Sequence, residues 1–411
     1  MGGNRITSID TVRGVAVLGI LVMNIIGMAF AGAAYLNPIY TGGNEPVNIA
    51  LWAVAYVAVD GKMRALFAML FGASLLLMAE GGRPERATAR HVARMAVLFL
   101  FGMLHASLLW SGDILLPFAL VGLAIWPLRN QPVQRLFLFG VIALGLQAAI
   151  TASFGMQALQ VQAAVQGPNP SPAALEAWES LRSATYSPPD AVAEETAMYR
   201  SGLSDILSIR HQSVLFARFF LLPFVFFAES VGLMLIGMGL YRLGWWQGGF
   251  ASAHYRRLAA RLIPLGLVLG GVLGWLFARS GFSAISFYFT DAARVFVAPM
   301  LSLGYAAALI ALVQSGALPG LVSRLAACGR MALSNYLAAS ILGNLIFTGI
   351  GLGLYGQLSR LAVMGVVLAI WALQLGWSRP WLEHFRYGPF EWLWRSLACW
   401  QRQPMKPPAY Q

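Results

Sequence analysis

The chain has little charge. Asp, Glu, Lys and Arg make up 11% of its 411 positions, whereas hydrophobic residues make up 58% and the mean hydropathy is +0.67. A soluble chain of this length would normally carry about 25% charged residues. This scarcity excludes an ordinary water-soluble domain. It also leaves no soluble basic face for a nucleic acid, although the formal net charge is +12.

Cysteine is scarce as well. Cys328 and Cys399 lie far apart in the sequence, and no spacing typical of a disulfide framework or a metal site is present. We therefore expect two free thiols and no metal.

What the chain has instead is a series of long apolar runs. Each is near the roughly 20 residues that a helix needs to cross a membrane. We interpret the sequence as an all-α, polytopic membrane helical bundle with about ten transmembrane helices. The predicted spans are 12–30, 48–79, 93–110, 114–128, 136–154, 214–242, 262–278, 295–314, 331–352 and 359–376.

Basic residues are unevenly shared between the predicted loops. Most of the 28 Lys and Arg residues fall in the segments that lie on the same side as both chain ends. Because Lys and Arg accumulate in cytoplasmic loops, we expect both termini to be cytoplasmic. The start of the chain, residues 1–34, resembles a secretory signal, but its long apolar run favours a retained span.

One segment, 155–213, differs from the rest because it is rich in Pro, Ser and charge. Ser171-Pro172 and Ser187-Pro188 are typical of helix starts. We expect two or three short helices here, on the outer face over the mouth of the bundle; a solvated connector is the alternative. The predicted organisation is an N-terminal membrane half (1–154), this insertion (155–213), a C-terminal membrane half (214–378) and a cytoplasmic tail (379–411).

Ionisable side chains inside predicted spans are costly and commonly mark functional sites. Asp10 and Arg13, at the cytoplasmic mouth of the first span, have the spacing of an ion pair on one helix face. The pair can serve structure alone or contact a substrate.

The segment "DGKMRALFAMLFG", residues 60–72, holds three charges at its start. Asp60 and Arg64 are four positions apart, which predicts pairing across a helical turn. Gly61 predicts a break in the helix, and exposed backbone at this depth occurs only where it lines a cavity or is buried in protein. We therefore expect Asp60, Lys62 and Arg64 to border a polar cavity.

The stretch "FLFGMLHASLLWSGDILLPFAL", residues 99–120, places a histidine within an apolar run. On a continuous helix Arg94, Gly102 and His105 share one face, and the glycine leaves space below the imidazole. A Ser-Gly dipeptide then breaks the chain, so that Asp113 can fold back toward His105. Such a contact would hold the imidazole in one tautomer, as a base requires. A purely structural histidine is the alternative.

Two later spans carry further polar groups. Arg218 and Glu229 share a face of span 214–242 but are too far apart to pair, so each needs a partner on another helix or water. Asn335 lies in a run of neutral polar residues in the ninth span, and Asn344 follows it.

Six segments of the chain carry a family resemblance. They are "IDTVRGVAVLGILVMN", "DGKMRALFAMLFG", "GMLHASLLWSGDILLPFAL", "GMGLYRLG", "GRMALSNYLAAS" and "FRYGPFEWLWRSL". In this order they resemble the successive signatures of the YeiB-like family of bacterial inner-membrane proteins, with Met63 where Phe is usual and Ser334 where Thr is usual. That family is grouped with a transmembrane acyltransferase superfamily. The resemblance therefore implies transfer of an acyl group from cytoplasmic acyl-CoA to an acceptor on the outer side.

The resemblance also implies roles for residues: His105 is the family's histidine candidate, and its charged residues are Asp10, Arg13, Asp60, Lys62 and Arg64. From the residues themselves we add Asp113, which would orient His105, as the second catalytic candidate. The residues expected to contact a substrate or cofactor are Asp10, Arg13, Asp60, Lys62, Arg64, Arg94, Glu229, Arg330 and Asn335.

The spacing of these residues permits acyl transfer. Arginine suits coenzyme phosphates, and Arg13, Arg90, Arg94 and Arg330 lie at the predicted cytoplasmic edge. His105 is eleven residues beyond Arg94, about 16 Å along a helix and similar to a pantetheine arm. The imidazole would then act as a general base or as a transiently acylated nucleophile.

Two other functions remain open at this point: a small-molecule transporter that uses the charges as a substrate or proton site, and a scaffold without chemistry. The expected partners are the lipid bilayer and a small-molecule or glycan acceptor, with a homodimer as a further alternative. No nucleic acid is expected.

Overall fold

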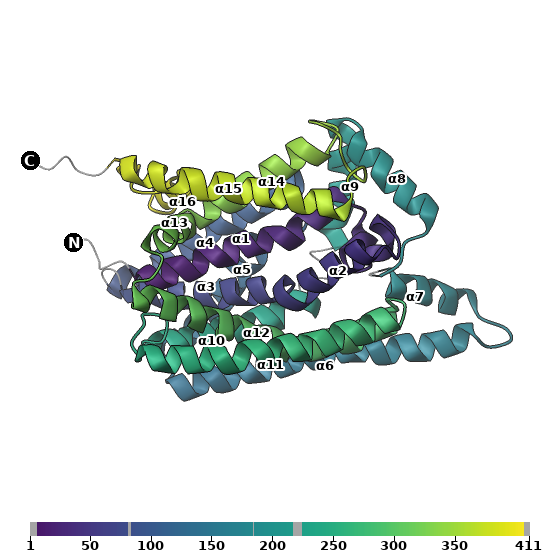
Figure 1. Cartoon of the computed structure of the whole chain (residues 1–411), viewed down its shortest axis with the longest axis horizontal. Coiled ribbons are helices and arrows are strands. Elements are labelled where there is room, and N and C mark those ends of the chain that lie inside the picture. Colours follow the sequence, from purple (N-terminus) through teal and green to yellow (C-terminus); the bar gives the residue numbers. More distant parts are fainter. Residues whose placement is uncertain (1–5, 81–83, 184, 217–223, 407–411) are drawn as a thin grey trace, which may run out of the picture.

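The computed structural model describes residues 6–80, 84–183, 185–216 and 224–406, and the regular structure within these ranges is helical. Long helices run side by side along one axis (Figure 1). The α-helices are α1 (Thr7–Ala29), α2 (Pro46–Val54), α3 (Lys62–Glu80), α4 (Ala87–Leu104), α5 (Leu115–Ile125), α6 (Val133–Val165), α7 (Pro172–Arg182), α8 (Pro189–Arg200), α9 (Leu203–Phe216), α10 (Phe227–Arg242), α11 (Ser252–Arg279), α12 (Ala284–Ser315), α13 (Pro319–Arg330), α14 (Ala332–Phe347), α15 (Arg360–His384) and α16 (Pro389–Ala398).

The predicted polytopic all-α membrane bundle is confirmed. Within the described ranges, eight helical segments are long and apolar enough to cross a membrane. The number is nine if α13 and α14, which meet at a bend of 81°, form one broken span. The span predicted at 114–128 corresponds to Leu115–Asn130, an apolar segment shorter than the others. The difference from the predicted ten therefore lies in one short segment and one bent pair.

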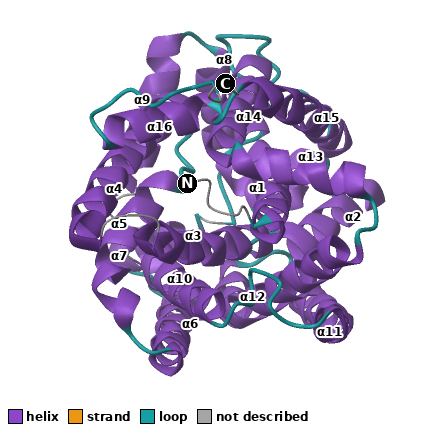
Figure 2. Ribbon diagram, turned by 90° about the vertical axis from the view of Figure 1, so that its left-hand side faces the viewer, coloured by secondary structure: helices purple, strands orange, loops and turns teal. Residues whose placement is uncertain are grey.

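Both chain ends lie at one end of the bundle, and α7 and α8 of the insertion lie at the opposite end (Figure 1). This agrees with the prediction that the two termini share a side. Seen from the end where the termini lie, α6 and α11 stand at the periphery (Figure 2). Their apolar stretches are only 28% and 22% buried, so their outward faces are suited to lipid.

The insertion forms the short helices α7, α8 and α9, as predicted. The Ser171 hydroxyl caps α7 by accepting a hydrogen bond from Ala174 N at 3.2 Å. The cap predicted at Ser187 is wrong: α8 begins at Pro189 with no side-chain cap. The backbone amide of Ser187 instead donates to Tyr40 Oη at 2.9 Å, because the segment is docked on the bundle.

Further contacts fasten the insertion to the end of the bundle opposite the chain termini, so it is more than a solvated connector. Asn37 Nδ2 donates to the carbonyl of Thr185 at 3.1 Å. The Glu195 carboxylate accepts from Gly32 N at 3.1 Å and from Tyr355 Oη at 3.0 Å. Burial raises the pKa of Glu195, and these two hydrogen bonds oppose that rise.

Helix α1 packs against α3, α13, α14 and α15. Its crossing with α13 depends on two glycines. A Cβ on Gly14 would lie 2.0 Å from the carbonyl oxygen of Leu325, and one on Gly329 would lie 1.9 Å from that of Asp10. No side chain fits there, so the backbones of the two helices touch.

The C-terminal segment folds back onto the bundle. The last span was predicted to end at 376, but α15 continues to His384. Helix α16 then contacts α4 and α14: Trp394 Nε1 donates to the carbonyl of Arg94 at 2.9 Å, and Glu391 accepts from the amide of Ser334 at 3.0 Å. Much of the predicted tail is therefore packed.

Candidate functional site

The helix that carries His105 changes its winding at that residue. Helix α4 ends at Leu104, and one π-helical turn follows over His105–Leu109. It closes with a hydrogen bond from Trp110 N to the His105 carbonyl at 2.9 Å. Such turns are frequent at functional sites. The imidazole is buried here, with His105 2% exposed.

Asp113 folds back to the imidazole, which confirms the predicted contact. Its Oδ1 lies 2.8 Å from His105 Nδ1. Its Oδ2 accepts a hydrogen bond from Leu116 N at 2.7 Å, in the first turn of α5. A carboxylate at a helix N-terminus is stabilised by the free amides and the helix dipole. Both carboxylate oxygens are therefore held in place.

The second ring nitrogen of His105 contacts a residue that was not predicted for the site. Nε2 lies 2.9 Å from Ser340 Oγ on α14. The Asp113 carboxylate can only accept, so Nδ1 carries a proton; when the ring is neutral, Nε2 carries the lone pair. The Ser340 hydroxyl then donates to Nε2. Ser340 ends the motif "GRMALSNYLAAS", but only the crossing of α14 with the π turn brings it to His105.

Gly102 provides the space for Asp113. A Cβ there would lie 2.4 Å from Leu116 N and 2.8 Å from Asp113 Oδ2. We expect Gly102→Ala to lower the free energy of unfolding by about 1–3 kcal/mol through overpacking. Gly145→Ala is the control, because nothing lies within 4 Å of a Cβ at that helical position. Denaturant unfolding in detergent measures the free energy of unfolding of both variants. If the two are equally stable, the loop around Asp113 can move to make room for the added methyl group.

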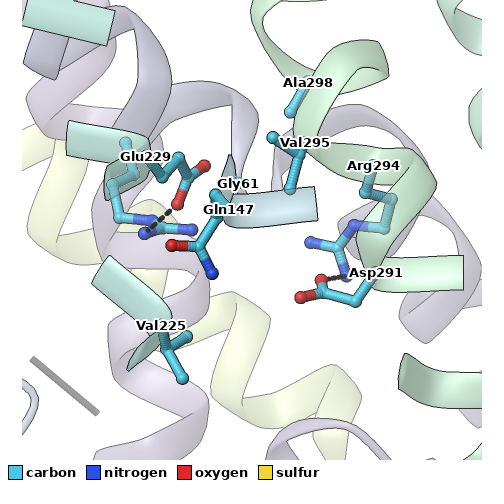
Figure 3. A pocket seen from close by; sticks show the side chains of 9 residues that line it. Gly61, Gln147, Val225, Glu229, Asp291, Arg294, Val295 and Ala298 are labelled. Carbon is cyan, nitrogen blue, oxygen red and sulfur yellow. Dashed lines mark ion pairs between the residues drawn. The ribbon is translucent and has the colours of Figure 1, made fainter. Parts of the chain in front are cut away.

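A second polar group of residues surrounds a cavity between α3, α6, α10 and α12 (Figure 3). The space there that no atom fills, counted together with the open solvent at its mouth, is about 330 Å³. Its lining is Gly61, Arg64, Gln147, Val225, Glu229, Asp291, Arg294, Val295 and Ala298.

The predicted pair of Asp60 with Arg64 is wrong. Asp60 pairs with Arg294 at 2.6 Å, and Arg64 pairs with Glu229 at 2.8 Å. The reason is local: Asp60 follows a π-helical turn over Ala55–Val59 and precedes Gly61, whose φ is +76°. Asp60 thus lies outside α3, and the geometry of residues four apart on a helix does not apply.

Glu229 does have its partner on another helix, as predicted, whereas Arg218 lies outside the described residues. Arg294 also pairs with Asp291 at 3.4 Å. Figure 3 shows the Glu229 pair and the Asp291–Arg294 pair on different sides of the cavity, with Gln147 between them.

Two polar atoms at this cavity remain unsatisfied. Gln147 Oε1 and Arg294 Nε are buried without a hydrogen-bond partner among the described residues. Of the three charged residues expected to border a cavity, Arg64 is in this lining, whereas Asp60 and Lys62 are not. Lys62 donates from Nζ to the carbonyl of Tyr56 at 2.7 Å. The cavity therefore offers spare hydrogen-bonding groups to a polar occupant.

The other predicted residues are not brought to His105. Asp10 and Arg13 form the expected pair at 3.0 Å. Arg94 lies beside α16, and Arg330 ends α13. The Asn335 amide donates to Ser378 Oγ and accepts from Trp377 Nε1, so it ties α14 to α15. None of these predicted residues lines the cavity of Figure 3 or the smaller pocket near Leu109 and Asn344.

A smaller pocket lies one helical turn from the histidine, and neither His105 nor Ser340 is part of its lining. Leu109 and Asn344, one helical turn from His105 and Ser340, belong to its wall, with Arg210 of α9. Arg210 donates to the carbonyl of Leu108 at 2.6 Å and also to Asn344. The insertion thus forms part of the wall of this pocket.

The two cysteines, Cys328 and Cys399, are both free thiols. In the ranges that the structure describes, no group of three or more His, Cys, Asp or Glu residues is arranged to hold a metal.

Comparison with known proteins agrees with the motifs. Residues 240–401 match the family described as "Protein of unknown function (DUF418)". The chain is 32% identical over 405 residues to "Uncharacterized protein YeiB" of Escherichia coli (strain K12), with 96% of each chain covered. It is 28% identical to "Uncharacterized protein YxaH" of Bacillus subtilis (strain 168), over 98% of this chain and 96% of that one. No solved structure matches. This multi-pass membrane protein therefore belongs to the YeiB-like DUF418 family.

Proposed function

We propose that the protein is an acyltransferase of the bacterial inner membrane, which moves an acyl group from cytoplasmic acyl-CoA to an acceptor at the outer face. The observation that carries the proposal is the hydrogen bond of 2.8 Å between His105 and Asp113. Acyl transfer needs a base in a defined tautomer beside the group that loses a proton. With Asp113 on Nδ1, the free lone pair of Nε2 meets this need.

The position of the histidine along α4 suits a donor that enters from the other side. With both termini in the cytoplasm, His105 lies toward the outer end of α4 and Arg94 lies nearer the inner end. Their separation of eleven residues corresponds to about 16 Å of helix. A pantetheine arm is of this length, so its phosphates can stay near arginine while the thioester reaches the imidazole.

A second candidate, a small-molecule transporter, is favoured by the charged cavity. Its two ion pairs and the unsatisfied Gln147 Oε1 could bind a polar solute during passage. A transporter would need no thioester.

The two candidates differ in vesicles that contain the purified full chain. If the protein is an acyltransferase, we expect acyl-CoA added on the side of the membrane that carries the chain termini to release free coenzyme A. The labelled acyl group should then be found as the free acid or on an added acceptor. A thermal-shift screen against acyl-CoA species should show stabilisation. Solute flux without any thioester, together with no coenzyme A release for any acyl chain, would establish the transporter and contradict the proposal.

A further inference from the structure

We infer that Ser340 is a catalytic nucleophile that is transiently acylated by the acyl thioester; this rests on the proposed acyl transfer. The inference assigns a covalent intermediate, which the histidine alone does not specify.

The first argument is an unusual hydroxyl. A buried serine inside a helix normally donates to the carbonyl four residues earlier. Ser302 and Ser378 do so at 2.7 and 2.6 Å. Ser340 Oγ lies 3.4 Å from the corresponding Tyr336 carbonyl but 2.9 Å from His105 Nε2. The hydroxyl has therefore turned from its backbone acceptor to the imidazole.

The second argument is the full chain of hydrogen bonds. The carboxylate of Asp113 holds Nδ1–H, and Leu116 N holds that carboxylate. Nε2 is left as an acceptor that faces one hydroxyl. A nucleophile, a base and a group that orients the base are the parts of a serine acyl-transfer site, which recurs on unrelated folds. Here they come from α14, the π turn and the loop before α5.

The chemistry balances without another reactant. Ser340 Oγ attacks the thioester carbonyl carbon, the C–S bond breaks, and an ester C–O bond forms. The hydroxyl proton passes to His105 Nε2 and then to the leaving sulfur, which departs as the coenzyme A thiol. In the second half an acceptor hydroxyl or amine attacks the ester. Its proton passes through Nε2 to Ser340 Oγ, and the starting state returns.

Acid quenching of the full chain in detergent with radiolabelled acetyl-CoA tests the inference. We expect label on the peptide that contains Ser340, stable to neutral hydroxylamine as an oxygen ester. Ser340→Ala should remove the label and lower turnover by roughly 10³-fold or more. Ser340→Cys should carry label that neutral hydroxylamine releases, which keeps the test valid if the alanine variant folds poorly. Ser302→Ala is the control variant. The Ser302 hydroxyl is equally buried but donates to the backbone, so this variant should be labelled like the wild type.

The outcomes separate the two proposals. Turnover that needs His105 but survives in Ser340→Ala overturns the nucleophile and leaves the acyltransferase standing. An absence of both label and turnover in the wild type overturns the nucleophile and the proposed function together.

Discussion

Replacing His105 with Gln is expected to lower acyl transfer by about 10²–10⁴-fold, the usual contribution of a general base. Glutamine keeps a hydrogen-bonding side chain near Asp113 and Ser340, so the fold should tolerate it. It cannot take a proton at neutral pH, and the Ser340 hydroxyl then has no base. Coenzyme A release by the purified protein measures the loss.

His91→Gln is the matched control. His91 lies on the same helix and is 4% exposed. Its Nε2 lies 3.1 Å from the Gly122 carbonyl oxygen, and its ring stacks on Trp126 at 3.9 Å between centroids. Loss of this packing should lower the melting temperature without lowering the rate per folded molecule. Equal turnover in the two variants would show that His105 is structural as well.

Breaking the ion pair between Asp60 and Arg294 is expected to have the largest effect on stability. The two side chains are 10% and 7% exposed and lie 2.6 Å apart. Removing one partner of a buried pair costs about 3–5 kcal/mol, because the other charge is left buried. We expect Asp60→Asn and Arg294→Gln to approach this loss. In Asp60→Asn, Asp291 still lies 3.4 Å from Arg294, so the loss of stability should be smaller in this variant.

A double-mutant cycle tests which arginine Asp60 uses. Asp60→Asn with Arg294→Gln should be coupled by about 1–3 kcal/mol, as residues in direct contact are. Asp60→Asn with Arg64→Gln should be coupled more weakly, because these two side chains form no ion pair. The free energy of unfolding in detergent gives both values. Stronger coupling to Arg64 would restore the pairing that the sequence alone predicted.

The candidate site contains some contacts that the sequence predicts and others that it does not. The contact of His105 with Asp113 was predictable because a glycine and a Ser-Gly break lie within one short stretch. Asp291 and Arg294 also have a local signal, since they are three apart in an apolar helix. Ser340 had none: it is 235 positions from His105, and apolar spans contain many serines.

The sequence by itself determined the class of the protein. Apolar runs of membrane length, the side shared by the termini, the short helices of the insertion and the family follow from residues near one another in the chain, because hydrophobicity and helix signals act locally. The tertiary structure decided the partners of the buried charges and of the imidazole. A buried charge pairs with whichever opposite group the helix crossings bring closest, and those crossings depend on glycine contacts, π turns and a bend of 81°. Spacing along a single helix contains none of that information.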